Sequence, residues 1–194
     1  MWEEQERFMR AIEHHDILQV VLSANKMNRK YHALGLYFSY ACQVGFPYLE
    51  FFLDLGADVN FNDPDVVCYT PLMESCLGGY FSNVQCLLRH GADVNLLTDK
   101  GESALHSACK QGGLDSVKLL IKNGANINAQ EVDGFTPLHF ASIHGQKDVV
   151  EFLLSVGADL NILTNSGDTA WLRARNSGQL HVSAFLEQYE SQSK

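Results

Sequence analysis

Between residues 136 and 157, the apolar residues fall into two runs that have the spacing of α-helices. The first run holds Leu138, Phe140 and Ala141, and the second holds Val149, Val150, Phe152, Leu153 and Leu154. Residues three and four apart share one face of a helix, so each run predicts a short helix with one buried face. Gly145 and Gly157 follow the two runs, as glycine often does where a helix ends.

The residues before the first run have the chemistry of a turn and a helix start. Thr136 can cap the helix with its hydroxyl, and Pro137 then takes the first helical position, where its missing N–H costs nothing. Asp133 and Gly134 are typical of a tight turn. The segment therefore predicts a turn followed by two helices.

Two motifs recur along the chain in one register. A Gly-Ala-Asp/Asn-apolar-Asn motif begins, with spacings of 35, 33 and 33 residues, at Gly56, Gly91, Gly124 and Gly157. A second motif, of the Thr-Pro-Leu-His type, begins at intervals of 33 residues at Thr70, Ser103, Thr136 and Thr169. Two landmarks with one period indicate stacked repeats of a single supersecondary unit.

The unit from Asp133 to Asn161 resembles the ankyrin repeat, and the resemblance extends over nearly the whole chain. It implies an all-α ankyrin-repeat solenoid of about six stacked helix–turn–helix units with projecting hairpin-like loops, in a single domain of residues 1–194. We expect an N-terminal cap at 1–30, repeats at 31–64, 65–97, 98–130 and 131–163, and a C-terminal cap repeat at 164–194. In the family, the histidine of the motif commonly bonds near its threonine, and the last Asn of the glycine motif stabilises loops.

Three irregularities modify this picture. Leu36 and Tyr37 replace Thr-Pro in the repeat 31–64, and the loop from Phe61 to Tyr69 carries two extra residues. Trp171 stands where the motif has leucine, so we expect it to be buried under the last unit.

Charge and composition exclude several function classes. The chain has 14 Lys and Arg against 23 Asp and Glu, and its net charge of −9 argues against nucleic-acid binding. The N-terminus is acidic, unlike a signal peptide. The charge-free stretch 33–49 is shorter than the roughly 20 residues that span a bilayer. We expect a monomeric intracellular protein, in the cytoplasm or nucleus, that contacts neither membrane nor nucleic acid.

Cysteine and histidine placement predicts structural roles and no catalytic, metal or cofactor site. Cys42, Cys76 and Cys109 share one repeat position, where a small buried residue allows close helix packing. No Cys-x-x-Cys pair occurs, and five cysteines fit free thiols in a reducing compartment. His106 and His139 recur with the motif, so neither marks a unique catalytic site. We expect the protein not to be an enzyme.

The resemblance implies that another protein binds at the concave surface formed by loop tips and inner helices. The register predicts the candidate partner-binding residues Phe61, Val66, Val67, Tyr69, Leu77, Lys100, Glu102, Lys110, Phe135 and Ile143. We expect the centre of binding near Tyr69, because the enlarged loop is there and 12 of the 18 Phe and Tyr residues lie between residues 31 and 81. The alternative is that a divergent repeat needs this aromatic bulk for its own packing.

The expected function is therefore a non-catalytic scaffold or adaptor for protein–protein interaction. An alternative is a dedicated inhibitor or regulator that masks a kinase or transcription factor. The identity of the partner is not predicted.

Overall fold

The structure is a computed structural model that describes residues 31–45, 47–62 and 69–192. The predicted N-terminal cap and the candidates Val66 and Val67 lie outside the described residues. The chain divides into two compact units, Met1–Asp93 and Val94–Lys194, called here the N-terminal and C-terminal units. Within the described ranges the chain forms helices and turns without a strand, which confirms the all-α prediction.

The N-terminal unit contains two described helix pairs. They are α3 (Tyr31–Gln43) with α4 (Leu49–Asp54), and α5 (Pro71–Leu77) with α6 (Phe81–Arg89). The inner helices α3 and α5 pack against each other, and each also packs against its own outer helix. Phe38, Phe52, Leu72 and Leu87 are fully buried in this unit. The helix α3 runs through Leu36 and Tyr37, the positions at which the later repeats begin their inner helices.

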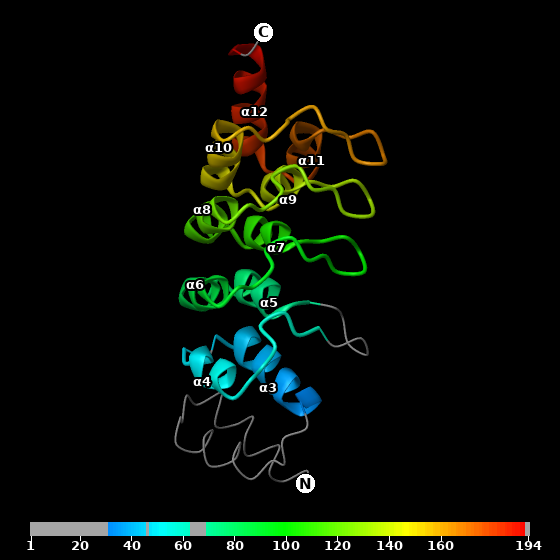
Figure 1. The fold of residues 1–194 in the computed structure, drawn as a ribbon. Coiled ribbons are helices and arrows are strands. Elements are labelled where there is room, and N and C mark those ends of the chain that lie inside the picture. Colours follow the sequence, from blue (N-terminus) through cyan, green and yellow to red (C-terminus); the bar gives the residue numbers. More distant parts are fainter. Residues whose placement is uncertain (1–30, 46, 63–68, 193–194) are drawn as a thin grey trace. The chain divides into compact units, whose positions relative to one another are not determined.

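The C-terminal unit contains three helix pairs. The inner helices are α7 (Ala104–Gln111), α9 (Pro137–Ile143) and α11 (Ala170–Asn176); the outer helices are α8 (Leu114–Lys122), α10 (Lys147–Ser155) and α12 (Leu180–Gln192). The inner helices pack side by side in the order α7, α9, α11. The loops before α7, α9 and α11 project to one side of this unit (Figure 1).

The residues predicted to begin and end the helices do so in the structure. The hydroxyls of Thr70, Thr136 and Thr169 accept hydrogen bonds from backbone N–H groups in the first turns of α5, α9 and α11. Gly145 and Gly157 follow α9 and α10 with φ angles of 73° and 97°, a left-handed region in which residues with a Cβ are strained. Local chemistry thus delimits each short helix.

The prediction that Trp171 is buried is wrong, because its side chain is only half-buried. The helix α11 is the last inner helix among the described residues, and none of these residues forms a further inner helix over the position. The guanidinium of Arg175 lies 5.4 Å from the centre of the indole ring instead.

Candidate functional site

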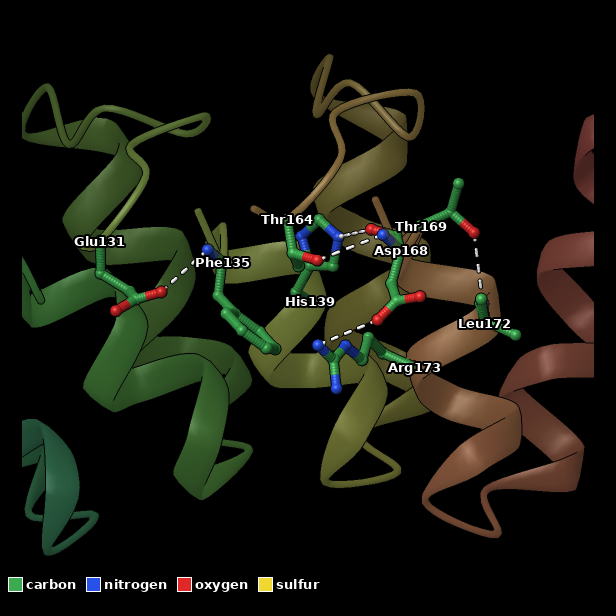
Figure 2. Close-up of polar contacts among 8 residues, drawn as sticks. All are labelled: Glu131, Phe135, His139, Thr164, Asp168, Thr169, Leu172 and Arg173. Carbon is green, nitrogen blue, oxygen red and sulfur yellow. Dashed lines mark hydrogen bonds and ion pairs between the residues drawn. The ribbon is translucent and has the colours of Figure 1, made fainter. Parts of the chain in front are cut away.

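The hairpin loops of the C-terminal unit are closed by the same hydrogen bonds at each repeat. The hydroxyls of Thr98 and Thr164 accept from the backbone N–H four residues later, at 3.1 and 3.2 Å. Glu131 occupies this position in the middle repeat, and its carboxylate accepts from the N–H of Phe135 at 2.9 Å (Figure 2). The same carboxylate accepts from the N–H of Asp133 at 3.0 Å. This role of Glu131 was not predicted, although its 33-residue register with Thr98 and Thr164 signals it.

Neighbouring hairpins are also bonded to each other. The N–H of Val132 donates to the carbonyl of Lys100 at 2.8 Å, and the N–H of Asn165 donates to the carbonyl of Asp133 at 2.9 Å. The side chain of Asn165 donates to the carbonyl of Val132 at 2.9 Å. The three loop tips therefore form one hydrogen-bonded row.

Two histidines each connect the inner helix of their own repeat to the hairpin of the next repeat. The Nδ1 atom of His139 accepts from the N–H of Thr136 at 3.2 Å, so Nε2 carries the proton and donates to the carbonyl of Asp168 at 3.2 Å. His106 makes the same bonds to Ser103 and Phe135. Burial lowers the pKa of both histidines and favours the neutral ring that this pattern requires. The expected bond to the motif is confirmed, and the link to the next repeat was missed.

The last asparagine of the glycine motif also connects successive repeats. The side-chain oxygens of Asn60, Asn95 and Asn128 accept from a backbone N–H of the following repeat at 2.8, 3.0 and 3.0 Å. These bonds confirm the expected loop role for three of the four asparagines. The amide of Asn161 bonds to Asp159 of its own repeat instead.

The described cysteines belong to the buried core. Cys42, Cys76, Cys86 and Cys109 are buried thiols that form no disulfide, as expected, and Cys68 lies outside the described residues. Burial raises the pKa of the Cys42 and Cys76 thiols, so these groups stay protonated and are poor nucleophiles. In the part of the chain that the structure describes, no three His, Cys, Asp or Glu side chains are placed to hold a metal ion.

Three predicted binding residues of the N-terminal unit lie in the described ranges, and they are only partly exposed. Phe61, Tyr69 and Leu77 are all half-buried. The ring of Phe61 occupies the space that a Cβ on Gly35 would take. Phe61 therefore fills its own repeat, which supports the packing explanation for this aromatic residue.

The predicted residues of the C-terminal unit lie on neighbouring hairpins and inner helices. Lys100 and Lys110 are exposed, whereas Glu102, Phe135 and Ile143 are half-buried. The ring of Phe135 contacts two side chains that are not among the predicted binding residues. Arg173 holds its guanidinium 4.7 Å from the Phe135 ring centre, and Phe140 meets the same ring edge-on at 6.1 Å.

Arg173 is fixed at this position by a second contact. Its Nη2 atom lies 2.9 Å from the carboxylate of Asp168, so the cation is held between a carboxylate and an aromatic face (Figure 2). Asp168, Arg173 and Phe135 therefore present charged and apolar groups that are already held in place by one another.

A family model described as ankyrin repeats (3 copies) matches residues 38–131, 81–164 and 126–192. These matches cover most of the chain, which therefore belongs to the ankyrin-repeat family. Ankyrin repeats are generally protein–protein interaction modules. A comparison with curated proteins yields no match. None of the helices in the described ranges has the length and hydropathy needed to cross a lipid bilayer.

Proposed function

We propose that the protein is a non-catalytic scaffold or adaptor that binds a partner protein through the hairpin tips and inner helices of its repeats. The proposal rests on a contrast between two sets of residues. The residues that close each hairpin, called here the frame, act alike in the three repeats, whereas the side chains at the hairpin tips differ. Thr98, Glu131 and Thr164 close their hairpins in the same way. The exposed side chains that follow them differ completely, being Asp99, Val132 and Asn165.

This contrast is what a binding surface requires. Frame residues hold the backbone in place, so variable side chains can change specificity without disturbing the fold. Tips bonded in a row lose little conformational freedom on binding, which favours affinity. A typical interface of roughly 800 Å² per partner covers several adjacent tips.

Affinity purification with quantitative mass spectrometry tests the proposal. The full chain is compared with Asp99→Lys/Asp133→Lys at the tips and with Asp115→Lys/Asp148→Lys on the outer helices α8 and α10. All four aspartates are exposed, so neither pair should unfold the protein. We expect a protein that the wild type and the outer-helix variant retain and the tip variant loses. No reproducible partner, or equal capture by all three proteins, contradicts the proposal.

A further inference from the structure

The repeats of the C-terminal unit can be compared position by position, because equivalent residues lie 33 positions apart. On the hairpin and inner helix of the repeat 131–163, four positions are apolar: Val132, Phe135, Phe140 and Ile143, called here the apolar patch. The preceding repeat carries at these positions Asp99, Glu102, Ser107 and Lys110. The following repeat carries Asn165, Asp168, Arg173 and Asn176.

The frame does not require apolar side chains at these four positions. Hairpin closure and the inner helix form equally with the polar sets on both sides. Val132 is 58% exposed, and Phe140 and Ile143 are the residues of α9 that are not buried. The partly exposed face of α9 is therefore apolar. Val132 is exposed, and the other three side chains of the patch are half-buried. Apolar groups that stay partly in contact with water are unfavourable unless another molecule covers them.

The two aromatic rings of the apolar patch are packed against neighbouring groups. The ring of Phe140 meets those of Phe135 and His106 edge-on, at 6.1 and 5.3 Å between ring centres. His144 stacks on Phe140 with an angle of 7° between the rings. Because neighbours already hold these rings, an apolar side chain can bind against them with little further loss of rotamer entropy.

The charges near the hairpin end of the patch indicate the character of the partner. Asp133 is exposed next to Val132, and the backbone bond between Val132 and Lys100 brings exposed Asp99 close by. Lys100 offsets one of these charges, and Arg173 neutralises Asp168. The remaining charge is negative, as is the net charge of −9, and both attract a basic segment.

We propose that the apolar patch is the docking site for a short segment of the partner that places an aromatic or branched aliphatic anchor beside a lysine or arginine. The anchor packs on Phe135, Phe140 and Ile143. The basic side chain reaches the carboxylates of Asp99 and Asp133. This inference rests on the proposed function and assigns it a site and a class of ligand.

Peptide display tests the inference with defined probes. A random-peptide phage library is selected against the full chain, and enriched peptides are synthesised with a fluorophore and titrated by anisotropy. The main variant is Val132→Asp/Ile143→Lys, which installs the residues that the preceding repeat has at these positions. Val156→Asn is the matched control, because Val156 is an exposed valine after α10 and its equivalent in the preceding repeat is Asn123.

We expect enriched peptides to combine an apolar anchor with Lys or Arg. The main variant should weaken them at least about tenfold, as loss of a central anchor does, while Val156→Asn should bind normally. Asp99→Asn/Asp133→Asn should weaken binding about threefold at low salt, and less at high salt because salt screens exposed charges. Unchanged circular dichroism and melting temperature establish that each variant is folded.

Three results overturn the inference. They are failure to enrich any peptide, enrichment of peptides with acidic flanks, and equal binding to the wild type and the main variant. The last result moves the docking site elsewhere but leaves the proposed function intact. The proposed function fails separately, when affinity purification finds no protein partner.

Discussion

The two units stabilise the same type of repeat by different means. In the N-terminal unit, aromatic rings fill spaces left by glycines: Phe61 lies against Gly35, and Tyr80 lies against Gly45 and Gly78. In the C-terminal unit, histidines and hairpin bonds connect successive repeats. Met73 takes the histidine position in α5, and its side chain has no N–H to donate. Stability should therefore depend on apolar volume in one unit and on polar pairing in the other.

The largest effect is expected for Phe52→Ala in the N-terminal unit. Phe52 is fully buried and packs against Phe38 and Phe51, so truncation leaves a cavity that costs about 3–5 kcal/mol. Urea unfolding followed by circular dichroism measures the change. The partly exposed Phe81 gives the control Phe81→Ala, which should cost much less. Equal losses for the two variants would show that buried volume does not dominate there.

Next in size is His139→Leu, which introduces the residue that α11 has at the same position. The change leaves the carbonyl of Asp168 and the N–H of Thr136 without their partner, at a cost of about 1–3 kcal/mol. His144→Leu is the control, because His144 is exposed and its Nδ1 atom bonds to the carbonyl of Phe140 within its own repeat. Chemical denaturation that gives His139→Leu the stability of the wild type refutes a stabilising bridge.

A smaller effect is expected from the asparagine pair Asn128→Ala and Asn161→Ala. Asn128 bonds to the next repeat through the N–H of Asp159, so its loss should cost about 1 kcal/mol. Asn161 bonds within its own turn, so its loss should cost less. Thermal unfolding compares the two, and a larger loss for Asn161→Ala contradicts the linking role.

The most gradual effect is the dependence of stability on pH. Burial lowers the pKa of His106 and His139 below the ordinary 6.5, so the unfolded chain binds protons more readily than the folded one. Their contribution is present in full above pH 6.5 and is lost as pH falls through the lowered pKa values. Between pH 7.5 and pH 5, the melting temperature should fall less steeply with pH for His106→Leu/His139→Leu than for the wild type. Equal slopes exclude this linkage.

Much of the fold was predictable because its signals are local and periodic. Thr136, Pro137 and Gly145 set the bounds of a helix by their own backbone chemistry, and the 33-residue register transfers that result to other repeats. The contact of Phe61 with Gly35 was not predictable in this way, since it joins residues with no shared motif. Glu131 was missed because a carboxylate performs the task of a threonine hydroxyl.

The candidate site was predicted less completely than the fold. The register identified Phe135 and Ile143 as surface candidates, since periodicity separates buried positions from uncovered ones. It did not identify Phe140, whose apolar character suits a core position equally well. Only the packing of α9 distinguishes the two cases, because it leaves the side chain of Phe140 half-buried and not in the core.

Hydrogen–deuterium exchange of the full chain, with and without a selected peptide or captured partner, tests the central claim most directly. The account predicts slower exchange on binding in the hairpins 98–102 and 131–135 and around Ile143 and His144. The outer helices α8 and α10 should change little. Protection confined to α8 and α10, or to the N-terminal unit, would contradict binding at the hairpin tips and inner helices of the C-terminal unit.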